Sequence, residues 1–135
     1  MNSLVKNIGK EAFCRVAKRG ISFAPDIDAE ALFNKIDAAL SLVSNQNDYR
    51  INKTTPRHWE IRYSWSDMLV VDVHASKTRR TVYIDFDPEL SSCYDIAEEC
   101  FFKVKEAVNL VQKELINKIV ESTRENEQEV DFDWI

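Results

Sequence analysis

The sequence predicts a single α+β domain, in which a three- or four-stranded antiparallel β-meander is packed on one face by helices and is followed by a long C-terminal helix and an acidic tail. Residues 57–86 alternate between apolar and polar side chains, as half-buried strands do. Apolar residues recur at helical spacing before and after this segment. The 135 residues include only two Gly and three Pro, which favours regular structure with short connections.

Two helices are expected before the sheet. The first covers residues 3–18 and has Gly20 as its C-terminal cap. The second covers residues 29–44, with Asp26 or Asp28 as its N-cap, and should lie across the apolar side of the sheet. The segment 1–20 carries five Lys or Arg residues against one Glu, a net charge of +4. A basic amphipathic helix of this kind is usually a docked helix with a solvated cationic side, although it could also contact nucleic acid or a membrane.

The meander is expected to consist of strands over 59–65, 69–75 and 81–86, after a short edge strand at 49–51. Requiring the apolar sides to coincide pairs Trp65 with Leu69 and Ala75 with Arg80, which leaves hairpin loops at 66–68 and 76–79. In this register Val73 lies opposite both Ile61 and Val82. All three residues should then face the helices.

The same register predicts the neighbours on the polar side of the sheet. Glu60 should lie beside His74, and Arg62 beside Asp72 with Tyr83 next along. A Glu and a His within reach of each other could support acid–base chemistry. Cross-strand ion pairs on a solvated face explain the pattern equally simply, and the sequence contains no phosphate loop, nucleophile elbow or metal-ligand spacing. We therefore predict no catalytic residue, no metal ligand and no cofactor.

A long helix is predicted after the meander, starting at Asp87 or Ser92 and continuing to about residue 123. Some 32 residues would span roughly 48 Å, whereas a compact domain of this length has a radius of gyration of about 14 Å. The helix should therefore overhang its own core. Its distal part, around Val111, Leu115 and Ile119, could pair with a second copy in a homodimer, or other helices could cover it.

The C-terminal residues 125–135 differ in composition from the domain of residues 1–124. Residues 121–135 include six acidic residues and one Arg, a net charge of -5. We expect this tail to be loose in isolation and either to dock on another protein or to fold back as an edge strand. Its candidate partner-binding residues are Glu127, Glu129, Asp131, Phe132, Asp133, Trp134 and Ile135.

The last seven residues, EVDFDWI, resemble the acidic tails of single-stranded DNA-binding proteins. That resemblance implies recruitment of a partner protein through a hydrophobic pocket with a basic rim. The residues before the tail do not show the pattern of the five-stranded barrel found in those proteins.

Composition bounds the remaining possibilities. No apolar run is long enough to span a membrane, so we expect a soluble protein. Cys14, Cys93 and Cys100 lack metal spacing and read as free thiols, which suits a cytoplasmic location.

Three hypotheses for function follow. The first is a non-catalytic protein-binding module of the inhibitor, immunity, chaperone or phage-regulator type, which binds a basic surface and uses aromatic anchors such as Phe132, Trp134, Trp59 or Trp65. The second is a nucleic-acid-associated protein that combines the basic N-terminal helix with the loop SKTRR at 76–80. The third is an enzyme that uses Glu60 and His74, together with Arg62, Asp72 and Tyr83.

Overall fold

The computed structural model of the chain describes residues 8–43, 48–89 and 93–133, and the side chains among them up to Thr123. The elements follow in the order α2 (Lys10–Arg19), β1 (Ile21–Ser22), α3 (Ala29–Ser41), β2 (Tyr49–Thr55), β3 (His58–Tyr63), β4 (Leu69–Ser76), β5 (Thr81–Phe86) and α4 (Cys93–Asp133). The strands form one antiparallel sheet in the order β1-β5-β4-β3-β2. The predicted α+β class is confirmed, and the sheet has five strands where three or four were expected.

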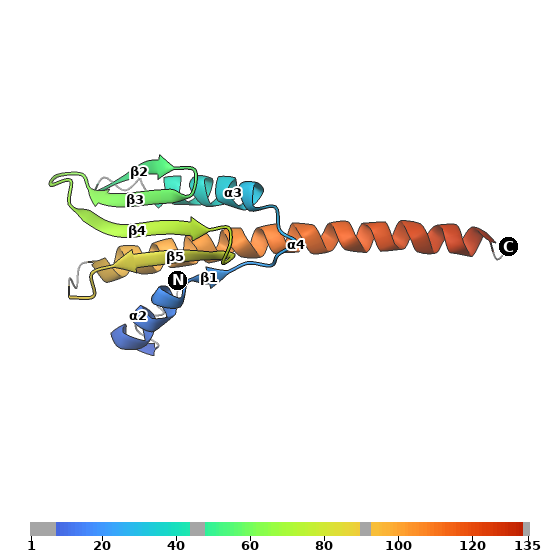
Figure 1. Cartoon of the computed structure of the whole chain (residues 1–135), viewed down its shortest axis with the longest axis horizontal. Coiled ribbons are helices and arrows are strands. Elements are labelled where there is room, and N and C mark those ends of the chain that lie inside the picture. Colours follow the sequence, from blue (N-terminus) through green and yellow to red (C-terminus); the bar gives the residue numbers. More distant parts are fainter. Residues whose placement is uncertain (1–7, 44–47, 90–92, 134–135) are drawn as a thin grey trace.

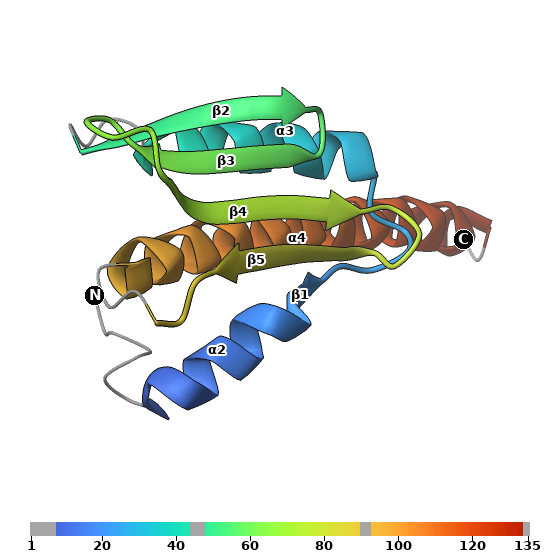
Figure 2. The same cartoon turned by 60° about the vertical axis from the view of Figure 1, so that its left-hand side comes forward.

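The helices lie on one side of this sheet (Figures 1 and 2). Helix α3 lies behind β2 and β3, α4 runs behind β4 and β5, and α2 packs beside β5. Alternation puts the apolar side chains of the strands on the helix side, where Ile61, Val73 and Val82 are fully buried. The opposite side of the sheet carries the polar side chains, and no helix of the described residues crosses it.

The register differs from the predicted one by two residues in both hairpins of the meander. Ile61 lies opposite Val71, and Val73 lies opposite Trp59 on one side and Ile84 on the other. The first hairpin closes where Tyr63 N donates to Met68 O at 3.0 Å, which leaves residues 64–67 as its turn. Trp65 is therefore part of this turn and is 77% exposed, whereas a place on the apolar side of the strand was expected.

A β-bulge at Val70 also shifts the pairing of β3 with β4. Ile61 pairs with Val71 and the next residue, Arg62, pairs with Leu69, so Val70 has no direct partner. Val70 and Val71 are both buried, because the extra residue interrupts the alternation of the strand. The second hairpin keeps a four-residue turn, but this turn covers residues 77–80 after the pair Ser76 and Thr81.

Helix α2 ends at Gly20, as predicted. Gly20 has φ 77° and its N–H reaches the carbonyl oxygens of Val16 and Ala17. The helix begins after Gly9, which has φ 84°, so it is shorter than the 3–18 segment expected. Residues 3–7 of that prediction lie outside the described residues.

Helix α3 begins at the predicted cap Asp28, whose carboxylate accepts from Glu30 N at 3.1 Å. It contributes Leu32, Phe33, Ile36 and Leu40 to the core. Polar contacts also tie it to the sheet, and in one of them Nε1 of the fully buried Trp59 donates to Oδ1 of Asp37 at 3.0 Å. Lys53 of the edge strand β2 also reaches Asp37, with 3.7 Å between its Nζ and Oδ1.

Candidate functional site

Helix α4 consists of a buried half and a protruding half. Its 41 residues span about 60 Å at 1.5 Å each. Buried residues occur along it as far as Val111, and Leu115 still packs partly against the core. From Ile116 to Thr123 every residue is exposed, and Figure 1 shows this part of α4 continuing past the sheet and past α3. We call residues 116–133 the α4 arm.

The first turns of the α4 arm expose apolar side chains on one side of the helix. Ile116, Ile119 and Val120 are 59%, 55% and 42% exposed, and their spacing of i, i+3 and i+4 places them together on the helix surface. Leu115 borders them. We call Ile116, Ile119 and Val120 the arm patch. The sequence pattern indicated Ile119 as part of a pairing surface, but Ile116 lies outside the stripe that faces the core and was missed.

The acidic segment continues the same helix. Helix α4 extends to Asp133, so Glu127, Glu129, Asp131, Phe132 and Asp133 are helical. The predicted end of the helix at about residue 123 and the alternative of an edge strand are therefore wrong for these residues. The two remaining candidate partner-binding residues, Trp134 and Ile135, lie outside the described residues.

The polar side of the sheet brings both histidines of the chain together. His58 of β3 lies opposite His74 of β4, and Glu60 lies opposite Asp72. The predicted pairing of Glu60 with His74 is therefore wrong by two residues, because the hairpin turn and the Val70 bulge shift the register. Arg62 bonds to Glu60, with 2.8 Å between Nη2 and Oε2.

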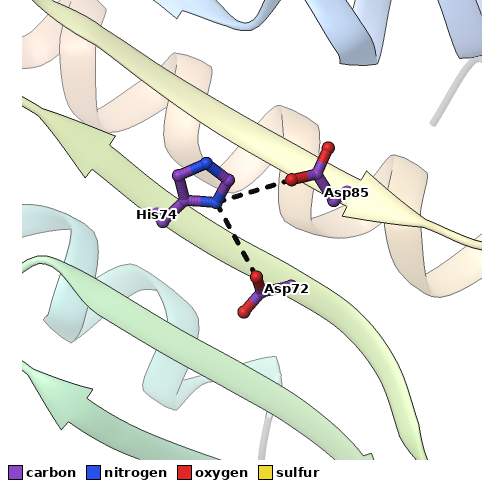
Figure 3. Close-up of side chains that lie close together, drawn as sticks. All are labelled: Asp72, His74 and Asp85. Carbon is purple, nitrogen blue, oxygen red and sulfur yellow. Dashed lines mark ion pairs between the residues drawn. The ribbon is translucent and has the colours of Figure 1, made fainter.

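Asp72 is the centre of this polar cluster. One of its carboxylate oxygens, Oδ1, bonds to His58 Nε2. The other, Oδ2, lies 3.8 Å from Nδ1 of His74. On the next strand, Asp85 is directly opposite Asp72, and its Oδ2 lies 3.5 Å from the same His74 nitrogen. Figure 3 shows His74 directing this nitrogen toward both carboxylates, on the side of the strands that faces away from the helices.

The ring of Tyr83 packs against the His74 imidazole. The two rings stack with centroids 5.2 Å apart and planes 26° apart. A groove of about 520 Å³ runs beside the cluster and is lined by His58, Asp72 and His74 among others. Sequence reasoning grouped Asp72, His74 and Tyr83 but missed His58 and Asp85. Both alternate with buried residues of their strands, so only the correct register could have joined them to the cluster.

The two basic segments approach each other at the C-terminal end of α2, whereas Lys10 at the start of α2 lies over the ring of Tyr94. Strand β1 follows α2 directly and pairs with β5, and Phe23 N donates to Arg80 O at 2.9 Å. Lys77 of the turn is engaged by Glu30 of α3. The predicted basic patch is therefore reduced by at least one cation, and Lys6, which it also included, lies outside the described residues.

The predicted free thiols are confirmed, since Cys93 and Cys100 are buried and Cys14 is half-buried with no disulfide. Burial raises the pKa of the Cys100 thiol well above its usual range, which keeps this thiol neutral and unreactive. None of the helices in the described residues is both long and apolar enough to cross a bilayer.

Comparison of the chain with protein-family models, with curated proteins and with solved structures finds no match.

Proposed function

We propose that this protein is a non-catalytic protein-binding module that presents the α4 arm to a partner protein with a basic surface. The observation that carries the proposal is the arm patch, three large apolar side chains exposed on a helix that has left its own core. Exposed apolar groups on a protruding element favour an interaction, because burying them against a partner removes them from water.

The spacing of the arm patch suits insertion into a hydrophobic groove. Helices recognised in this way offer anchors at i, i+3, i+4 and i+7. Ile116, Ile119 and Val120 supply the first three positions, and Thr123 follows at the fourth. One side of the arm can therefore be buried while its other sides stay in water.

Charge supports a basic partner. The α4 arm contains six acidic residues against Lys118 and Arg124, a net charge of -4. Opposite potential on the partner would raise the rate of association and suppress wrong partners. The acidic residues proposed for this contact are Glu127, Glu129, Asp131 and Asp133, and Phe132, Trp134 and Ile135 are proposed as apolar anchors beyond the arm patch.

A different protein is a better candidate for the partner than a second copy of the chain. In a parallel pair of arms the acidic ends would lie together and repel. The three residues of the arm patch cover little more than one helical turn, whereas a stable coiled coil needs about three to four heptads. Inhibitors, immunity proteins, chaperones and phage regulators are classes that act through such one-sided contacts, and the three free thiols suit action in the cytoplasm.

The test uses the full chain as bait in an extract of its own organism, followed by reconstitution with the purified partner. The variant carries Ile116→Asp and Val120→Asp. The control is Leu42→Asp at the C-cap of α3, a residue that is 55% exposed and therefore matched to the arm patch. We expect the wild type and the control to bind the same protein, and the arm variant to lose at least about tenfold in affinity.

Thermal unfolding verifies that all three chains are equally folded. Equal binding by the arm variant would contradict the proposal. So would light scattering that shows the wild type doubling its mass with concentration and the arm variant remaining monomeric, since the arm would then bind a second copy.

A further inference from the structure

We propose that Asp72, His74 and Asp85 form a binding site for a divalent transition-metal ion such as Zn²⁺ on the polar side of the sheet. Each residue offers one ligand atom, and the three atoms lie within 4.8 Å of one another. The site lies on β4 and β5, on the side of the sheet opposite α4, so its test is independent of the proposed function.

The distances fit a shared ion. Zn²⁺ binds imidazole nitrogen and carboxylate oxygen at about 2.0–2.2 Å, so two ligands of one ion lie roughly 3–4 Å apart. The Nδ1 of His74 is 3.8 Å from Asp72 Oδ2 and 3.5 Å from Asp85 Oδ2. A small rotation of the exposed Asp85 carboxylate closes the third side of the triangle.

The nitrogen of His74 needs a partner. It is buried, and among the described residues it makes no hydrogen bond. Its separation of 3.5 Å from Asp85 is at the limit of hydrogen bonding, and the geometry does not satisfy it. A buried nitrogen without a hydrogen bond is costly, and a metal ion between the ring and the two carboxylates would use its lone pair.

The charges of the cluster also require compensation. Asp72 and Asp85 are directly opposite each other on neighbouring strands, where like charges destabilise a sheet. Arg62 binds Glu60 and the carbonyl oxygen of Asp67, and Arg50 binds the carboxylate of Asp67. Arg57 lines the adjoining groove, but among the described residues the ion pairs of Asp72 and Asp85 are with histidines. A divalent cation would neutralise both aspartates at once.

Neighbouring side chains already fix the orientation of the ligands. His58 holds Oδ1 of Asp72 and leaves Oδ2 toward His74, and Tyr83 stacks on the imidazole. Partners of this kind orient metal ligands and contribute to affinity. The adjoining groove opens the site to solvent, so water can complete a tetrahedral shell.

The donor set selects the class of ion. One imidazole with two carboxylates suits Zn²⁺ and similar transition metals, whereas Mg²⁺ and Ca²⁺ prefer shells made of oxygen alone. We therefore expect Zn²⁺ to bind more tightly than Mg²⁺ by orders of magnitude.

The test is calorimetric titration of the full chain with ZnCl₂ and with MgCl₂ near neutral pH. We expect one Zn²⁺ per chain. His74→Gln and Asp85→Asn should each weaken Zn²⁺ binding by more than about 100-fold, and His58→Gln by about tenfold. Controls are Cys14→Ser, which removes the half-buried thiol, and the pair Glu127→Gln and Glu129→Gln, which removes carboxylates of the α4 arm; both should bind like the wild type.

Thermal unfolding provides a second measurement. Zn²⁺ should raise the Tm of the wild type and leave that of Asp85→Asn unchanged, because only a folded site binds the ion. Circular dichroism confirms that the variants fold. Zn²⁺ binding that is absent, or that His74→Gln and Asp85→Asn leave unaltered, would overturn the proposal and leave the histidines as counterions of the aspartates.

Discussion

Gly20 is the residue at which the chain turns from α2 into the sheet. Its φ of 77° and ψ of -174° lie in a region that only glycine adopts readily. An added Cβ would also lie 2.6 Å from Val82 O and 2.7 Å from Cγ2 of Thr81. We expect Gly20→Ala to lower the free energy of unfolding by about 1–3 kcal/mol from the backbone alone, and by more because of these contacts.

Gly9 supplies the matched control for this substitution. It has φ 84° and ψ 162°, and no atom lies within 4 Å of its added Cβ. Gly9→Ala should therefore lower the free energy of unfolding by the backbone contribution alone, without a steric contribution from a new contact. Urea unfolding of the two variants measures the difference, and equal losses would contradict the close approach of Gly20 to β5.

Tyr94 should make stability fall at alkaline pH. Its hydroxyl donates to Pro88 O at 2.9 Å and lies 3.4 Å from Cys14 Sγ. The contact with Cys14, together with burial, raises the pKa of Tyr94 from 10.0 to about 12. The folded state therefore prefers the neutral phenol. This contribution is complete below pH 10, where the unfolded phenol is also neutral, and it is lost as pH rises toward 12.

The measurement is urea unfolding of the wild type and of Tyr94→Phe across this pH range. Tyr94→Phe removes the hydrogen bond and the titration, so its deficit in stability should shrink as pH rises. Cys100 also ionises in the unfolded state at these pH values, because burial raises its pKa only in the folded state. This lowers the stability of the wild type and of Tyr94→Phe by the same amount, so it does not affect the difference between them. A deficit that stays constant would contradict the assignment.

At the scale of the element, α4 should respond to substitution differently along its length. Phe101 is 4% exposed and its ring contacts Phe13 with centroids 6.0 Å apart. Phe101→Ala should cost about 3–5 kcal/mol in the free energy of unfolding. Ile119→Ala lies on the exposed α4 arm and should change it by no more than about 0.5 kcal/mol. Chemical denaturation of both variants measures this contrast. A large loss in Ile119→Ala would mean that the arm packs on the rest of the chain.

The strands show what alternation can and cannot predict. A pattern of period two identifies which side of each strand is apolar, so Ile61, Val73 and Val82 were predicted correctly as core residues. A shift of two residues preserves every side, so the same pattern could not fix the register. The deciding features are local, namely the turn before Met68 and the bulge at Val70. The turn contains no glycine, and Asp67 takes the positive φ of 59° instead.

For the whole molecule, the distribution of charge predicts how the proposed complex should depend on salt. The arm carries a net charge of -4, and attraction between exposed charges weakens as salt shortens the Debye length to about 3 Å at 1 M. We expect the association rate with the partner to fall at least about tenfold from low to high salt. Replacing Glu125, Glu127 and Glu129 with Gln should reduce that dependence. Stopped-flow kinetics measures it, and an equally steep dependence in this variant would place the electrostatic contact elsewhere.

The sequence predicted which helices and strands exist better than it predicted where they end. The overhang of α4 follows from its length and its lack of Gly and Pro, and it was predicted correctly. The continuation of α4 to Asp133 was not predicted, because the acidic composition of residues 125–133 is typical of disordered segments. Strand β1 was missed because two residues carry no periodicity. The cluster of Asp72, His74 and Asp85 required the register, which places Asp72 opposite Asp85.

The pairing of His58 with His74 has a practical consequence. These are the only two histidines in the chain, and their rings meet edge to face with centroids 6.2 Å apart. A proton NMR spectrum of the chain therefore contains two imidazole Hε1 signals, one from each of two neighbouring strands. These two signals can report binding or conformational change on the polar side of the sheet without an added label.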